Sequence, residues 1–308
     1  MRKIGIIGLG HVGRLLAHQI LISGMADQLV LIDQSDDLAV GLKTDLQNAE
    51  FAIMTSTEIK IQDYMALGDA DVLVTAFGDS KLLQEQQMAE LSRNGQAVRE
   101  IAPQVKQSGF HGVVFNISDP NEAITAYLQQ QLALPPKQVI GIGTTLDTAR
   151  LRQSVAKAAQ LSAKNVSGFV YGQHDGEKVF AWSTVTVNGQ SLDKSINGHH
   201  LDQNQLRINA DMDNWYTFHG LGYNASAVVA WSCQIISAIL GNAELSVPVA
   251  IYQPQYSTYV SFPTLVNRGG QGHPLLLNLY PVEEAGVKTA ASAIDQQIKI
   301  LQEGENDK

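Results

Sequence analysis

Three side chains in the second half of the sequence carry groups that together can move a proton and hold an anion. Asp147 and Arg150 are three positions apart, so on a helix they lie on one face, one turn apart. His174 lies in Gly172-Gln173-His174-Asp175-Gly176, which is typical of a turn between strands. An imidazole exchanges protons near neutral pH, a carboxylate fixes its tautomer, and a guanidinium holds a carboxylate by two hydrogen bonds. Taken separately, Asp147 and Arg150 could simply form a salt bridge on the surface of the helix. His174 alone could be a solvent-exposed residue of a turn.

The first 33 residues predict the elements that would present a cofactor to such groups. An apolar run, Ile4 to Ile7, precedes Gly8-Leu9-Gly10-His11-Val12-Gly13 and a helix-forming segment from Arg14 to Ser23. A second apolar run ends in Asp33, twenty residues after the last glycine of the motif. Strand, glycine turn, helix, strand and acid form the dinucleotide-binding fingerprint, although the glycine pattern alone would fit an ordinary turn between a strand and a helix.

Each residue of this fingerprint has a physical task. Gly8 permits the tight turn, Gly10 lets the backbone approach a pyrophosphate, and Gly13 lets the helix pack close to the strand. The N-terminus of the helix offers free N–H groups and the positive end of its dipole to the phosphates. Asp33 would accept hydrogen bonds from the ribose 2′-hydroxyl and repel a 2′-phosphate, which favours NAD over NADP.

Composition and charge narrow the class of protein. A chain of 308 residues with 44% hydrophobic and 17% charged residues can form two domains with a substantial core. The net charge of −9 argues against a nucleic-acid partner or an anionic membrane surface. Cys233 is the only cysteine, so we expect no internal disulfide and no metal site. No apolar run approaches the ~18 residues that cross a bilayer, so we expect a cytoplasmic protein.

The spacing of apolar segments predicts a nucleotide-binding domain over residues 1–143. Strands alternate with helices there, which is typical of a parallel, doubly wound sheet of the Rossmann type. Ligands bind at the carboxyl ends of such strands, where Phe77-Gly78 and Ser118-Asp119 fall. One long helix, from Gln84 to Gln107, contains Pro103, which we expect to break it.

Residues 144–308 follow a different pattern and predict an α+β substrate domain. A helix from Leu146 to Leu161 precedes two segments that alternate like antiparallel strands. Further helices are expected near residues 202–211 and 223–240.

With these motifs together, the chain resembles the L-lactate/malate dehydrogenase superfamily over essentially its whole length. The motifs that carry the resemblance are Gly8 to Gly13, Gly143-Thr144-Thr145-Leu146-Asp147-Thr148-Ala149-Arg150 and Gly172-Gln173-His174. Residues 110–113 and 180–185 are most similar to the L-2-hydroxyisocaproate dehydrogenase branch. The resemblance implies an NAD-dependent L-2-hydroxyacid dehydrogenase that reduces a 2-oxo acid with a larger apolar side chain. It also implies a homodimer or homotetramer.

The resemblance also implies roles for individual residues. His174 would be the acid/base, Asp147 its partner, and Arg150 the clamp for the substrate carboxylate. Asn224 would line the substrate pocket. The residues expected to contact the cofactor are Gly8, Gly10, His11, Val12, Gly13, Asp33, Ala76, Phe77, Gly78, Ser118 and Val228.

The chain departs from the family pattern at three positions that would contact the substrate. Nine residues after the glycine matching Gly78, the family has an arginine that polarises the substrate carbonyl, whereas this chain has Gln87. Losing such a donor costs ~2.7–4 kcal/mol, or ~10²–10³ in rate. Lys81 occupies a loop position that discriminates substrates in the family and would be a compensating cation, although a solvated loop lysine is the simpler interpretation. Asp119 replaces an asparagine, and its carboxylate would raise the pKa of a nearby histidine and disfavour an oxyanion.

Two hypotheses follow from these departures. In the first, the protein is a working dehydrogenase whose altered loop serves an unusual substrate. In the second, it is a low-activity or non-catalytic NAD(H)-binding paralogue. The presence of His174, Asp147 and Arg150 favours the first hypothesis, because a pure binding protein has no need of all three groups.

Overall fold

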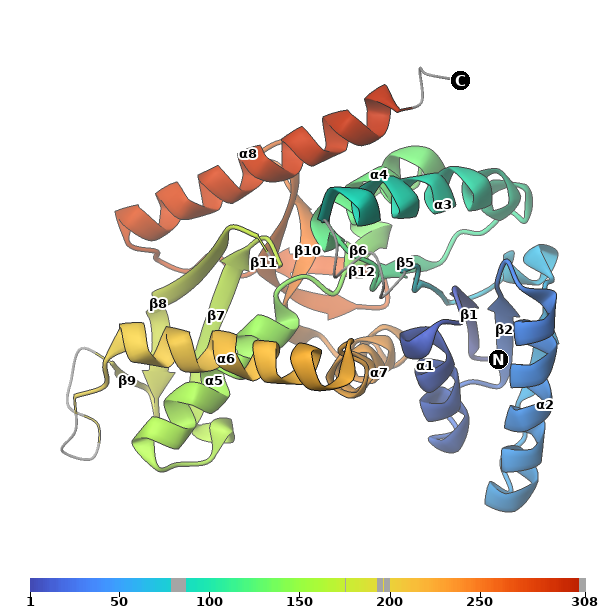
Figure 1. Cartoon of the computed structure of the whole chain (residues 1–308), viewed down its shortest axis with the longest axis horizontal. Coiled ribbons are helices and arrows are strands. Elements are labelled where there is room, and N and C mark those ends of the chain that lie inside the picture. The colour runs from blue at the N-terminus through green and yellow to red at the C-terminus, as the bar shows by residue number, and fades with distance from the viewer. Residues whose placement is uncertain (79–86, 175, 193–195, 197–199, 305–308) are drawn as a thin grey trace.

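The structure is a computed structural model that describes residues 1–78, 87–174, 176–192, 196 and 200–304. Its strands form one twelve-stranded sheet in the order β3-β2-β1-β4-β5-β6-β10-β11-β7-β8-β9, with β12 paired to β11. Helices α3, α4 and α8 pack together on one side of the molecule, and α1, α5, α6 and α7 lie on the opposite side (Figure 1).

The first half of the sheet is entirely parallel. Its strands run in the order 3-2-1-4-5-6, so the direction of strand addition reverses between β1 and β4, and a crevice opens there at the carboxyl ends. The predicted Rossmann-type doubly wound sheet is therefore confirmed. The strands are β1 (Lys3–Ile7), β2 (Gln28–Ile32), β3 (Glu58–Ile61), β4 (Val72–Thr75), β5 (Val113–Asn116) and β6 (Val139–Gly141).

Local sequence signals explain a helix start in this half, but they mispredict the course of the long helix α3. Ser35 caps α2 by accepting a hydrogen bond from the backbone N–H of Leu38 at 3.2 Å. The expectation that Pro103 breaks the long helix is wrong, because α3 runs through it while its apolar face, including Val98 and Ala102, is buried. The bounds are α1 (His11–Ile22), α2 (Asp36–Ile53), the short η1 (Tyr64–Leu67), α3 (Gln87–Gln107), α4 (Asn121–Leu132) and η3 (Pro136–Gln138).

In the second half, strand pairing becomes antiparallel, as predicted. Strand β10 pairs with β6 through Ala250 and Gly141, so the sheet continues across the predicted domain boundary at residues 143 and 144. The strands are β7 (Val166–Gly172), β8 (Lys178–Val187), β9 (Gln190–Ser191), β10 (Leu245–Gln253), β11 (Thr258–Asn267) and β12 (Gly270–Pro274). The helices are α5 (Thr145–Ala159), η4 (Ala163–Asn165), α6 (Gln203–Leu221), α7 (Ser226–Gly241) and α8 (Pro281–Glu303).

The connection between α6 and α7 differs from the prediction. Helix α6 continues well past residue 211 to Leu221 and is capped by Gly222, whose φ of 78° suits a glycine cap. Helix α7 begins at Ser226, so Tyr223 and Asn224 lie in the connection rather than in a helix. Among the described residues, no single helix is long and apolar enough to cross a bilayer; α6 and α7 pass that test only as a pair bent by 114°.

Candidate active site

A cavity of about 510 Å³ opens at the crevice predicted for a nucleotide. Its wall is formed by the turn after β1, the end of β2 and the segment after β4, with α3 on the far side. Six residues expected to contact the cofactor lie on this wall, namely Gly8, Gly10, Asp33, Ala76, Phe77 and Gly78.

The glycines of the turn leave the space that a pyrophosphate needs. Gly8 has φ of 98°, and a Cβ there would lie 2.5 Å from the carbonyl oxygen of Ala76. A Cβ at Gly13 would lie 1.9 Å from the carbonyl oxygen of Gly8, so any larger residue would push α1 away from the strand. At Gly10 nothing lies within 4 Å of such an atom, and the position faces the cavity. This cradle fits a dinucleotide phosphate bound at the N-terminus of α1.

Asp33 is held at the end of β2 by the backbone of two loops. Its Oδ2 accepts a hydrogen bond from the N–H of Leu9 at 2.7 Å, and its Oδ1 accepts one from Ser35 at 2.9 Å. The carboxylate is thereby fixed on the cavity wall, in a position suited to a ribose hydroxyl.

A second cavity, of about 140 Å³, adjoins the first. The two share Gly10, Ala76, Phe77 and Gly78, so a ligand lying across the turn after β1 would reach both. The second cavity brings together residues from both halves of the chain. Beyond the shared ones, its wall consists of His11, Val12, Glu90, Ile117, Asp119, Leu146, His174, Phe218, Tyr223, Asn224 and Val228.

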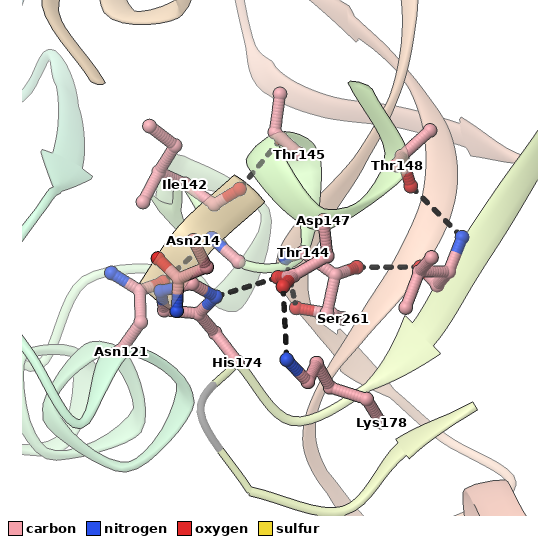
Figure 2. A network of polar contacts seen from close by, with 12 residues as sticks. Asn121, Ile142, Thr144, Thr145, Asp147, Thr148, His174, Lys178, Asn214 and Ser261 are labelled. Carbon is pink, nitrogen blue, oxygen red and sulfur yellow. Dashed lines mark hydrogen bonds and ion pairs between the residues drawn. The ribbon is translucent and has the colours of Figure 1, made fainter. Parts of the chain in front are cut away.

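The candidate acid/base pair lies at this second cavity. Nδ1 of His174, on the turn between β7 and β8, is 2.6 Å from Oδ2 of Asp147, on the first turn of α5. Figure 2 shows Asp147 between the His174 ring and the Lys178 ammonium. The start of α5 is fixed by Thr144, whose N–H donates to Oγ of Ser261 at 3.0 Å. The carboxylate is therefore held in one orientation toward the ring.

The charge of Asp147 is maintained despite its burial. Only 3% of this residue is exposed, and burial alone would raise the pKa of its carboxyl group. His174, Lys178 and Arg150 act in the opposite direction and hold the pKa of Asp147 well below its ordinary value. A buried carboxylate that stays ionised can stabilise a protonated imidazole.

Arg150 shares the helix face of Asp147, as its spacing predicts. Its Nη1 is 3.9 Å from Oδ1 of Asp147. Both side chains are buried, so the interpretation as a surface salt bridge is wrong. Nη1 of Arg150 forms no hydrogen bond to any residue that the structure describes. Arg150 itself is not among the described residues that line the second cavity.

Other expected site residues have different positions. Asn224 lines the second cavity, and its Nδ2 donates to Oδ1 of Asn214 at 3.1 Å. Ser118 is buried; its Oγ accepts from the N–H of Phe77 at 2.6 Å and therefore holds the backbone of the cavity wall. Lys81 lies outside the described residues. Gln87 is the first residue of α3, but its side chain is outside the described part.

Three carboxylate or ammonium groups of this site were not expected from the sequence. Lys178 has its Nζ 3.4 Å from Oδ1 of Asp147 and 3.1 Å from Oδ1 of Asp211. Glu90 lines the second cavity and is 3% exposed. Glu122 accepts a hydrogen bond from the backbone N–H of His174 at 3.0 Å. For two of them the sequence offered one signal, which is their spacing from expected site residues. Lys178 follows His174 by four residues, and Glu122 follows Asp119 by three.

Comparison with known proteins decides the family. The model of the lactate/malate dehydrogenase NAD-binding domain matches residues 2–141, and that of the family's α/β C-terminal domain matches residues 144–209. An L-lactate dehydrogenase from Shouchella clausii is 30% identical over 294 residues, which cover 91% of this chain and 89% of the relative. The chain belongs to the lactate/malate dehydrogenase family.

Other relatives extend this likeness over nearly the full length. L-lactate dehydrogenase 2 of Lactococcus lactis subsp. lactis is 27% identical over 315 residues, covering 97% of this chain and 98% of the relative. The crystal structure of the minor L-lactate dehydrogenase from Enterococcus mundtii, in a ligand-bound form, superposes with a TM-score of 0.90 at 27% identity, covering 97% of this chain and 98% of that one.

The family establishes the class of chemistry. The protein is an NAD-dependent oxidoreductase that acts on CH–OH groups, and more specifically a 2-hydroxyacid dehydrogenase. The predictions of NAD as cofactor and of the superfamily are confirmed. The relatives named above are L-lactate dehydrogenases, so the L-2-hydroxyisocaproate branch stays a prediction.

Proposed function

We propose that this protein reversibly reduces a 2-oxo acid with a larger apolar side chain to the L-2-hydroxy acid, using NADH. The observation that carries the proposal is the 2.6 Å contact between His174 and Asp147 at a cavity adjoining the nucleotide crevice. Hydride transfer to a carbonyl carbon requires a proton donor beside the carbonyl oxygen, and an imidazole paired with a carboxylate supplies one.

The proposed roles follow from the positions of the side chains. Reduced nicotinamide, when bound, supplies the hydride. Nδ1 of His174 is bonded to Asp147, so the proton passes to the substrate oxygen from Nε2. The ionised Asp147 stabilises the imidazolium before transfer and fixes the ring orientation. Arg150 is the proposed clamp for the substrate carboxylate, because its buried Nη1 has a hydrogen bond to donate.

The wall of the second cavity supports a larger apolar substrate side chain. Apolar and aromatic groups form much of it, namely Ile117, Leu146, Phe218, Tyr223 and Val228. Each methylene buried there contributes about 0.8 kcal/mol to binding. A side chain larger than a methyl group should therefore increase kcat/KM.

One observation favours the second hypothesis, a paralogue of low activity. Two carboxylates, Glu90 and Asp119, line the cavity, whereas the described residues of its wall include no lysine or arginine. In addition, Gln87 occupies the position at which the family has the arginine that polarises the substrate carbonyl. Negative charge near a developing oxyanion slows the reduction, so we expect modest turnover.

A panel of 2-oxo acids tests the proposal. NADH consumption is followed with pyruvate, oxaloacetate, 2-oxoisocaproate and phenylpyruvate, for the wild type and for His174→Gln. We expect turnover with one of the last two acids, its loss in the variant, and NADH affinity that is nearly unchanged. Tight NADH binding without turnover of any acid would support the paralogue of low activity instead.

A further inference from the structure

Glu122 is a buried carboxylate that the proposed mechanism does not use. It is the second residue of α4 and is 0% exposed. Its Oε1 accepts two hydrogen bonds, from the backbone N–H of His174 at 3.0 Å and from Oγ of Ser261 at 2.5 Å. Its Oε2 is buried and has no hydrogen-bond partner among the described residues. The carboxylate of Glu122 thus contacts the main chain of the candidate acid/base, whereas Asp147 contacts its ring.

Opposing effects act on the pKa of the Glu122 carboxyl group. Burial raises the pKa of this carboxyl group from 4.5 to about 7, while Ser261 and His174 act to lower it. Near neutral pH both of its protonation states are therefore populated. A charge that appears and disappears this close to His174 changes the affinity of the imidazole for a proton.

The charged and titratable groups around Glu122 come from several elements. Next to His174 in the chain, Nε2 of Gln173 donates to Oε1 of Gln297 on α8 at 2.8 Å, and this pair carries no charge. The charged side chain that acts on Glu122 is His174, whose ring contacts Asp147. Asp147 in turn contacts Lys178 on β8 and Arg150 on α5. Helix α3, which packs against α4, carries Glu90 and Arg99.

We propose that Glu122 is a positioning residue for His174 and that its negative charge sets the pH at which His174 takes up a proton. The inference rests on the proposed role of His174 as the acid/base. Asp147 acts on the ring through Nδ1, and Glu122 acts through the backbone N–H of the same residue.

The direction of the effect follows from the charges. When Glu122 is ionised, its negative charge favours the imidazolium form of His174, which is the form that donates the proton when a 2-oxo acid is reduced. When Glu122 is protonated, that support is lost, and the imidazole releases its proton more readily. The two groups therefore titrate as a coupled pair, and the apparent midpoints belong to both.

Two variants separate charge from shape. Glu122→Gln retains the size and one acceptor oxygen but removes the charge, whereas Glu122→Asp retains the charge on a shorter side chain. Histidine-labelled protein is titrated by NMR, with the His174 signal assigned by its absence in His174→Gln. We expect Glu122→Gln to move the His174 midpoint to lower pH by about one pH unit, and Glu122→Asp to stay closer to the wild type.

The pH profile of kcat/KM for reduction provides the second readout and should move in the same direction. A purely structural role predicts the opposite order, with the glutamine variant close to the wild type and the aspartate variant more perturbed. That order, or an unchanged midpoint in Glu122→Gln, would overturn the proposal.

Ser261→Ala keeps the inference testable if Glu122→Gln does not fold. This variant removes a hydrogen bond that favours the ionised carboxylate and also the acceptor of the Thr144 N–H. The His174 midpoint should move to lower pH by a smaller amount, and unchanged NADH affinity would show that α5 has kept its position. An unchanged midpoint would overturn the coupling. Because the NMR titration requires no turnover, a shifted midpoint with an inert substrate panel would refute the proposed function alone. Turnover with an unchanged midpoint would refute the coupling alone.

Discussion

Replacing Asp147 by asparagine removes one charge from the candidate acid/base pair while retaining its shape. In the wild type, Oδ2 of Asp147 is 2.6 Å from Nδ1 of His174, and its Oδ1 faces Lys178 and Arg150 at 3.4 and 3.9 Å. The amide can still form a hydrogen bond to the ring, but it cannot stabilise a positive charge on it. It also allows the wrong tautomer of the imidazole.

The size of the effect can be worked out from this geometry. Two unit charges whose centres are about 4 Å apart interact by about 4 kcal/mol at an effective dielectric constant near 20. If this stabilisation is present in the imidazolium form that donates the proton, its loss slows reduction by about 10³. The loss should appear in kcat, because NADH and the 2-oxo acid bind mainly through other groups.

The assay is steady-state NADH consumption with the best acid of the panel, together with NADH affinity from fluorescence titration. Asp211→Asn is the matched control, since it removes another carboxylate that Lys178 contacts, at 3.1 Å, while Asp147 stays in place. It should change kcat less than about fivefold, as expected for a partly exposed ion pair. A loss of less than tenfold in a folded Asp147→Asn protein would refute the electrostatic role. An equal loss of NADH affinity would point to a general distortion of the site.

Three further outcomes are expected. Asp33→Ala should relax the preference against NADPH, measured as the ratio of kcat/KM for the two cofactors; an unchanged ratio would mean that Asp33 is not at the ribose. Gln87→Arg should raise turnover, by up to the ~10²–10³ that one oxyanion donor contributes, and no gain would mean that another group polarises the carbonyl. The third concerns stability. Since the pKa of Glu122 is raised from 4.5 to about 7, the folded state binds the additional proton, and stability falls as pH rises through that window. Urea unfolding of Glu122→Gln should lack this decline of about 3 kcal/mol, and equal pH slopes in both proteins would contradict it.

The nucleotide half could be predicted from the sequence because its signals are local. Gly8, Gly10, Gly13 and Asp33 lie within one strand-helix-strand unit, and each is required by the geometry of that unit. The parallel pairing could be predicted for a similar reason, since strands alternate with helices along residues 1–143. Spacing also predicted that Asp147 and Arg150 share a helix face.

The remaining features depend on contacts between distant segments. Glu122 and His174 are 52 positions apart, and no local pattern shows that a carboxylate after Pro120 is buried behind a turn between strands. Pro103 was misjudged because the burial of the apolar face of α3 outweighs one missing backbone hydrogen bond. Propensity and spacing describe single elements, whereas packing decides which of their side chains meet.

The distribution of charge around His174 suggests how the site compensates for the glutamine at position 87. With no lysine or arginine among the described residues of the second cavity's wall, the imidazolium itself is the positive group that the geometry places beside the substrate oxygen. The fraction of His174 that is protonated then matters more for the rate than it would in a site that also has an arginine. Ionised Asp147 and Glu122 both extend the pH range over which His174 stays protonated. Glu90 and Asp119 on the cavity wall disfavour an oxyanion, whereas Asp147 and Glu122 help His174 to keep the proton that neutralises it.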